Sequence, residues 1–144
     1  MKYCIIIILI ILNWGVIILF SRIISLGLFG MEAYEVIVEA DISGGMPRFD
    51  IVGLPDTAVS ESRERVRSAI KNTNLQYPTS RITVNLAPAD MRKSGSAHDL
   101  AIFVAVLSSM GQIPDDISDC AFIGELSLGG GLRRVNGALT MAIE

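Results

Sequence analysis

The chain has 144 residues, of which 51% are hydrophobic, and a formal net charge of −3. This length is enough for one domain with a hydrophobic core. The mildly acidic balance excludes a general electrostatic attraction to nucleic acid, so such binding needs a local basic patch. The two cysteines, Cys4 and Cys120, lie far apart and indicate neither a disulfide framework nor a metal site. They are typical of a reduced cytoplasmic protein.

Residues 3–20 carry no charge and are mostly isoleucine and leucine, interrupted by Asn13 and Gly15. About 20 apolar residues cross a bilayer as a helix, so this stretch taken alone indicates a membrane anchor. A signal peptide with Lys2 as its basic end is the alternative, but no small-residue cleavage site follows.

The next part of the chain predicts strands. Residues 22–29 are short and apolar, and residues 34–42 alternate between apolar and polar side chains, as a strand with one buried face does. Residues 43–45 are a glycine turn signal, and residues 48–52 form a third short strand. We therefore expect a hairpin across the glycines. Asp56 then has the character of a helix N-cap.

A helix is predicted for residues 57–72, with one narrow buried face: Val59, Ser62, Val66, Ala69 and Ile70. Glu61 and Arg65 stand four residues apart, which predicts an ion pair on the helix surface. Cations recur at the same spacing at Arg63, Arg67 and Lys71. This stripe either contacts phosphate or is a solvated face whose charge the neighbouring glutamates offset.

The organising stretch is residues 82–107. Residues 82–86 alternate as a half-buried strand, which Pro88 ends because proline has no N–H for the ladder. Residues 92–95 form a polar loop. Residues 100–107 are apolar on every side, which predicts a helix buried on more than one face.

The start of this helix fits a capping box. The Ser96 hydroxyl is expected to accept from the backbone N–H of Asp99, whose carboxylate favours the positive end of the helix dipole. His98, the single histidine, has no second ligand nearby, so it indicates a capping turn and not a metal site. These three side chains point in different directions at a helix start, so they predict no catalytic triad.

The C-terminal part predicts a strand at residues 122–128, a tight turn at residues 129–131 and the start of a helix at residues 138–144. The last segment has no C-cap, which indicates that the chain ends inside a larger protein. No G-x-x-x-x-G-K-[ST] sequence occurs, so we expect no ATPase activity of this chain itself.

Three stretches carry a family resemblance: DISGGMPRFDIVGLPDTAVSESRERVRSAI (41–70), RITVNLAPADMRKSGSAHDL (81–100) and FIGELSLGGGLRRVNGAL (122–139). They closely resemble the N-terminal domain of the YifB/ComM family, bacterial Mg-chelatase-like AAA+ ATPases. The resemblance implies an α+β sandwich of the Lon-protease-like, ribosomal protein S-five domain-2-like fold. It also implies a following AAA+ module with ATP and Mg, a hexameric ring in the cytoplasm, and branch migration of DNA during natural transformation and recombination. Chelatase activity is not implied.

The resemblance divides the chain into residues 20–144, a Lon-like domain incomplete at its C-terminus, and residues 1–19, a hydrophobic extension. Family members typically begin with a Met and a few residues before a strand like residues 21–30, and no Met lies beside Phe20. We therefore expect an alternative start codon, with the extension as non-native upstream translation. If the extension is native, it is an inner-membrane anchor and the membrane is a partner.

The Lon resemblance raises a peptidase hypothesis, because Lon enzymes use a serine–lysine dyad. An ungapped alignment puts Ala97 at the nucleophile position, and a slip of one residue offers Ser96. The lysine position falls at about Leu139, and no lysine follows Lys93. A serine without a base stays a weak nucleophile, so we expect a non-catalytic domain in which Ser96 is a helix cap.

Charge alone marks six candidate DNA-binding residues: Arg63, Arg67, Arg92, Lys93, Arg133 and Arg134. On this hypothesis the domain helps to assemble the ring or touches DNA. The alternative is a protein-interaction or oligomerisation domain without DNA contact, and a Ser-Lys-type peptidase is disfavoured by the missing lysine.

Overall fold

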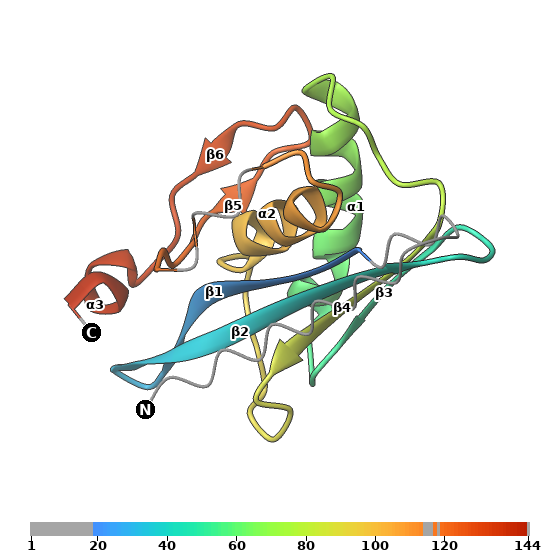
Figure 1. Cartoon of the computed structure of the whole chain (residues 1–144). Coiled ribbons are helices and arrows are strands. Elements are labelled where there is room, and N and C mark those ends of the chain that lie inside the picture. The colour runs from blue at the N-terminus through green and yellow to red at the C-terminus, as the bar shows by residue number, and fades with distance from the viewer. Residues whose placement is uncertain (1–18, 114–116, 118, 144) are drawn as a thin grey trace.

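The computed structural model describes residues 19–113, 117 and 119–143 (Figure 1). Its elements, in chain order, are β1 Leu19–Phe29, β2 Glu32–Ser43, β3 Arg48–Val52, α1 Thr57–Asn72, β4 Arg81–Ala87, α2 Asp99–Ser109, β5 Glu125–Leu126, β6 Leu132–Arg133 and α3 Ala138–Ile143. The predicted extension at residues 1–19 lies outside the described residues, except for its last position. Within the described ranges, no helix is long and apolar enough to cross a membrane.

The main sheet has the strand order β1-β2-β4-β3, and the expected hairpin between the second and third strands is wrong. β1 and β2 form the hairpin, whereas β4 lies between β2 and β3 and runs parallel to β3. Ser43 and Arg48 are both paired with Arg81 of β4. The link of residues 44–47 therefore crosses two strand spacings, roughly 10 Å. β4 takes the centre because its inward side chains are fully buried: Ile82, Val84 and Leu86.

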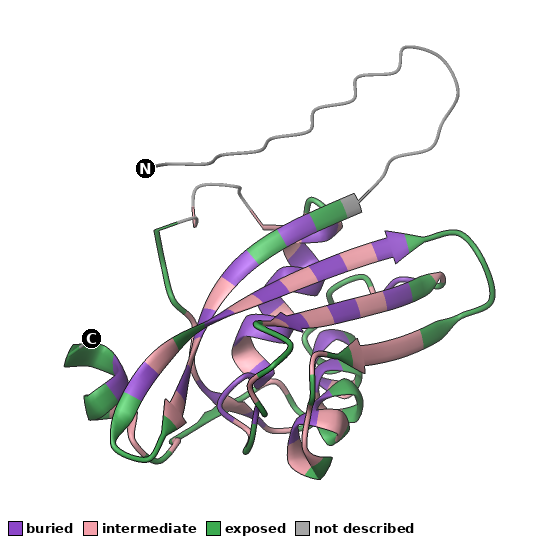
Figure 2. Cartoon of the chain, turned by 90° about the horizontal axis from the view of Figure 1, so that it is seen from below, coloured by how far each residue is buried: buried purple, intermediate pink, exposed green. Residues whose placement is uncertain are grey.

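Both long helices pack on one face of the sheet, so the fold class is α+β, as expected (Figure 1). The buried face of α1 consists of the five residues that its sequence predicts. Of the eight buried residues of α2, seven lie between Ala101 and Ser109 and are apolar or serine, and the eighth is Asp99. Along β1, β2 and β4 the inward side chains alternate with half-buried or exposed ones, which Figure 2 shows as bands. The opposite face of β2 carries Glu35, Ile37, Glu39 and Asp41.

The strand expected at residues 122–128 is reduced to β5. The backbone N–H groups that would extend this strand are hydrogen-bonded to other segments of the chain instead. The N–H of Phe122 donates to the carbonyl of Ile24 in β1 (2.8 Å), and the N–H of Gly124 donates to the carbonyl of Ala97 before α2 (2.9 Å). The glycine turn after β5 is confirmed, because Ser127 and Gly131 pair across it.

Gly53 is the position where β3 turns away from the sheet beside β4. Its φ is +100°, a left-handed conformation that favours glycine. A Cβ built on it would collide with the backbone carbonyl of Leu86 in the central strand. Two independent constraints, the positive φ angle and the close approach of the Leu86 carbonyl, therefore require glycine at this position.

Gly53→Ala is expected to lower the free energy of unfolding by about 2–4 kcal/mol, from left-handed strain and overpacking together. Gly44→Ala is the matched control, because nothing lies within 4 Å of its added Cβ; its change should stay within about 0.5 kcal/mol. Urea denaturation of both variants measures the difference. Equal destabilisation would contradict the close approach.

Candidate functional site

A cleft of about 310 Å³ lies at the N-terminal end of α2. It is enclosed by the loop of residues 94–98, by Gly27 and Leu28 of β1, and by side chains between Glu125 and Met141. Ser96 and Ala97, the two alternatives for a Lon-type nucleophile position, both line it. A larger hollow of about 480 Å³ beside Tyr77 has that phenol as its single ionisable group. The cleft is therefore the better candidate site.

The capping box predicted for α2 is wrong. His98 is the N-cap residue and makes no side-chain cap bond, and the Ser96 hydroxyl donates instead to Oε2 of Glu125 (2.5 Å). Asp99 keeps the expected place in the first turn, but its carboxylate binds Arg65 and not the backbone of Ser96. Both side chains have charge-assisted partners from other elements, and such bonds are about twice as strong as a neutral cap.

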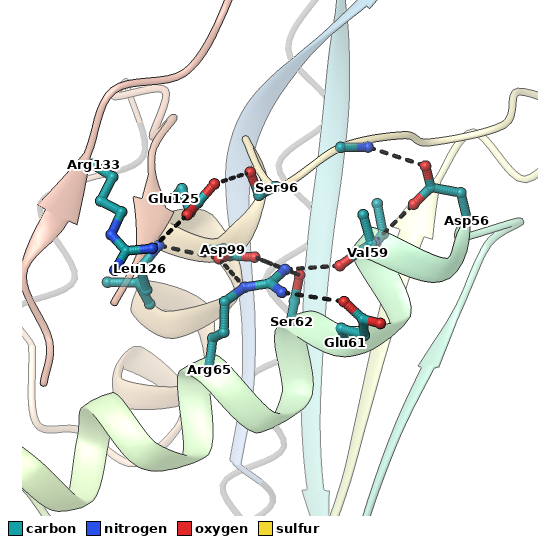
Figure 3. Close-up of polar contacts among 12 residues, drawn as sticks. Asp56, Val59, Glu61, Ser62, Arg65, Ser96, Asp99, Glu125, Leu126 and Arg133 are labelled. Atoms are coloured by element: carbon teal, nitrogen blue, oxygen red, sulfur yellow. Dashed lines mark hydrogen bonds and ion pairs between the residues drawn. The ribbon is translucent and has the colours of Figure 1, made fainter. Parts of the chain in front are cut away.

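The Asp99 carboxylate is fully buried and joins three elements (Figure 3). Its Oδ2 accepts from Nε of Arg65 (2.6 Å) and from the N–H of Leu126 in β5 (3.1 Å). Its Oδ1 accepts from Nη2 of Arg65 (3.0 Å) and from the Ser62 hydroxyl (2.5 Å). The hydrogen bond with Asp99 raises the pKa of Arg65. The ion pair that the sequence predicts, between Arg65 and Glu61, is present at 3.7 Å but is longer than the pair with Asp99.

His98 lies beneath the cleft with only 1% of its surface exposed. Its Nδ1 is 2.9 Å from the hydroxyl of Ser25, which is fully buried in β1. Burial is the main cause that lowers the pKa of His98 to about 4, so the ring is neutral near pH 7. The side chains of Ser96, His98 and Asp99 each have a different partner: Glu125, Ser25 and Arg65, respectively.

Lys93 was expected at a DNA-binding surface, and this prediction is wrong. The residue is fully buried, and its Nζ donates to the carbonyl oxygens of Pro88 and Met91 (2.7 Å for Met91). Its backbone pairs with Leu54 and Asp56 (3.1 and 2.9 Å). Burial lowers the pKa of Lys93. Its amine therefore fastens the loop that enters the cleft and is not available to a phosphate.

The other five candidate cations are exposed and fall into two groups. Arg134 lines the cleft, Arg133 binds Glu125 at its edge (3.2 Å), and Arg92 lies two residues before the cleft loop. Arg63 and Arg67 lie on α1 instead. Arg63 is 3.7 Å from Glu64, and Arg67 and Lys71 both stand over the ring of Tyr77, 5.6 Å from its centroid.

Sequence reasoning missed the partners that build the cleft. Ser25 sits in an apolar strand, and Glu125 sits in a predicted strand far from Ser96, so no local spacing signals either contact. The hydrogen bond from Ser96, followed by that from Arg133, lowers the pKa of Glu125. Within the described ranges, no group of three His, Cys, Asp or Glu side chains could hold a metal ion.

Comparison with known proteins gives one consistent family. The family described as subunit ChlI of Mg-chelatase matches residues 38–144. YifB of Escherichia coli, described as uncharacterized, is 46% identical over 116 residues, which are 80% of this chain and 23% of that protein. Competence protein ComM of Haemophilus influenzae is 43% identical over 111 residues, which are 76% of this chain and 22% of ComM. The chain thus spans less than a quarter of the length of these curated relatives.

Arg65→Ala is expected to destabilise the fold by about 3–5 kcal/mol, because it leaves the buried Asp99 carboxylate without its counter-charge. Arg63→Ala, on the exposed side of the same helix, is the matched control and should change stability by less than about 0.5 kcal/mol. Thermal or urea unfolding measures both. Similar effects of the two variants would show that Asp99 does not depend on Arg65.

The stability of the fold should depend on pH through His98. Its pKa in the folded protein, about 4, lies below the ordinary histidine value of 6.5, so the unfolded chain binds more protons between these values. The His98 contribution is complete above about pH 6.5, and about 3 kcal/mol of it is lost as the pH falls towards 4. Urea denaturation at several pH values in this range should show that the free energy of unfolding depends less on pH in His98→Gln. An unchanged pH dependence would show that a group other than His98 causes it.

Proposed function

This chain belongs to the YifB/ComM family of Mg-chelatase-like proteins, and we propose that residues 20–144 form the non-catalytic N-terminal domain of a longer AAA+ ATPase. The observation that carries this proposal is the identity of 46% and 43% to relatives more than four times the aligned length. ATP and Mg would then bind a module outside these residues. The whole protein would act in the cytoplasm as a hexameric ring that drives branch migration of DNA in transformation and recombination. The competence name of the ComM relative supports this role.

A Lon-protease-like, ribosomal protein S-five domain-2-like fold is the finer proposal for the architecture. A four-stranded mixed sheet with both long helices on one face supports it. The cleft at the N-terminus of α2 also coincides with the place where the Lon alignment puts Ala97.

The chemistry of the cleft supports a non-catalytic domain. The carboxylate beside the Ser96 hydroxyl belongs to Glu125, whose pKa is lowered, and a weaker base removes a serine proton less readily. The amine of Lys93 is held by two backbone carbonyls. Leu139, at the expected lysine position, is 76% exposed and carries no base.

Contact with DNA is proposed for the arginines around the cleft. Arg92 and Arg134 are exposed and form no ion pair within the described part of the chain. Uncommitted guanidinium groups of this kind neutralise phosphates and make binding depend on salt. Arg133 also reaches this edge, although it shares its charge with Glu125.

In the full-length protein, Arg92→Glu combined with Arg134→Glu should weaken binding to a DNA duplex roughly tenfold at 0.1 M salt and make its salt dependence shallower. Arg48→Glu is a control for charge reversal elsewhere on the surface, because Arg48 is exposed at the opposite end of the sheet, beside the start of β4, where it pairs with Asp50. Fluorescence anisotropy at several salt concentrations measures both effects. Equal affinity and slope for all proteins would overturn the DNA contact.

A second candidate is an interaction or oligomerisation domain without DNA contact. It is favoured by large apolar side chains exposed at the β1–β2 turn and on α3: Phe29, Met31, Leu139 and Ile143. α3 buries Met141 on its other side, so it is apolar on two faces. Native mass spectrometry with and without DNA separates the candidates, because an interaction domain oligomerises without DNA and gives no DNA-bound species.

A further inference from the structure

The cleft contains hydrogen-bond donors that the described residues leave unused. The loop before α2 presents the backbone N–H groups of Ser96, Ala97 and His98, and none of them donates to an acceptor in the described part of the chain. Ser96 and Ala97 precede the helix and His98 is its N-cap, so these N–H groups lie at the end of α2 where the helix dipole places a partial positive charge. This end of α2 therefore favours a negatively charged oxygen in the cleft.

The His98 ring is an independent donor in the same place. Among the described residues, every fully buried side-chain nitrogen or oxygen has a partner. Nδ1 is hydrogen-bonded to Ser25, whereas Nε2 has no hydrogen-bond partner among the described residues. Because Nε2 is therefore not fully buried and His98 lines the cleft, Nε2 is the ring atom that reaches the cleft. The fully buried Ser25 hydroxyl has no other acceptor in the described ranges, so we assign it as the donor to Nδ1. The neutral ring then carries its proton on Nε2, as a donor into the cleft.

The carboxylate oxygens of the cleft, in contrast, are already used. Oε2 of Glu125 accepts from Ser96, and Oε1 accepts from Arg133. The side chains of Arg134 and Asn136 add donors at the exposed edge, and neither has a hydrogen-bond partner within the described residues. The cleft thus offers a surplus of donors and one uncommitted positive charge to a ligand.

The remaining wall is apolar, formed by Leu28, Ala97, Val135 and Met141. Met141 and Ala97 belong to one small hydrophobic cluster, against which Leu28 and Val135 pack. A ligand that matches both walls carries an anionic oxygen next to an apolar group. A peptide that ends in an apolar residue has this chemistry, whereas a DNA phosphate is flanked by polar sugar and solvent.

We propose that this cleft binds the C-terminal carboxylate of a peptide whose last residue is apolar. The carboxylate accepts from the N–H groups at the start of α2 and from Nε2 of His98, and Arg134 supplies the counter-charge. The last side chain packs against Leu28, Val135 and Met141. This binding function goes beyond the accessory role in DNA remodelling and needs neither the ATPase module nor DNA contact.

The single histidine makes the test specific, because one set of imidazole signals reports on the cleft. The chain of 144 residues, labelled with ¹⁵N, is titrated with acetyl-Gly-Gly-Leu bearing either a free C-terminal carboxylate or a C-terminal amide. The carboxylate peptide should shift the Nε2–H signal of His98 and the amide signals of Ser96 and Ala97. The amide peptide should bind at least about tenfold more weakly.

Arg134→Gln should weaken binding of the carboxylate peptide severalfold, and Arg48→Gln, at the opposite end of the sheet, should leave it unchanged. Acetyl-Gly-Gly-Gly should also bind more weakly, because it lacks the apolar side chain. Equal shifts from the carboxylate and amide peptides, or no shift at millimolar peptide, would overturn the proposal. So would a single-stranded oligonucleotide or inorganic phosphate that produces the same shifts when the peptide does not. None of these outcomes changes the DNA-binding test of the full-length protein.

Discussion

The ion pair between Arg65 and Asp99 is the interaction on which the rest of the structure depends. A fully buried carboxylate is tolerated only where its charge is matched and its lone pairs are filled. Here the donors come from α1, in Arg65 and Ser62, and from the backbone of Leu126 in β5. The pair therefore holds both helices and the second sheet in one arrangement around the first turn of α2 (Figure 3).

This constraint determines the geometry of the cleft. With Asp99 held at the helix start, the N-cap residue His98 makes no side-chain cap bond, and residues 94–98 line the cleft. The loop before the turn is fastened from the other side. Lys93 binds the carbonyls of Pro88 and Met91, and the N–H of Gly95 donates to the Asp56 carboxylate (3.1 Å). A rigid loop positions unused donors more accurately than a mobile one, which is why this end of α2 can function as a binding site.

Local patterns predicted the elements better than their partners. The boundaries and buried face of α1 follow from its 3.6-residue period and from Asp56, which caps it as expected. The apolar run of α2 also predicted a buried helix. Strand pairing was predicted wrongly between β2 and β3, because a glycine turn signals a reversal but cannot show that another strand will enter the gap.

The sequence by itself determined the family, the α+β class, the two long helices and the absence of a lysine after Lys93, because these depend on local periodicity and residue identity. Tertiary structure alone decided what each polar side chain does. Ser96 and Asp99 do not form the predicted capping box, because Glu125 of β5 and Arg65 of α1 bind them more strongly. Lys93 is buried for the same kind of reason, since its amine donates to the backbone carbonyls of Pro88 and Met91. Contacts between distant segments have no local signature, so only the fold reveals them.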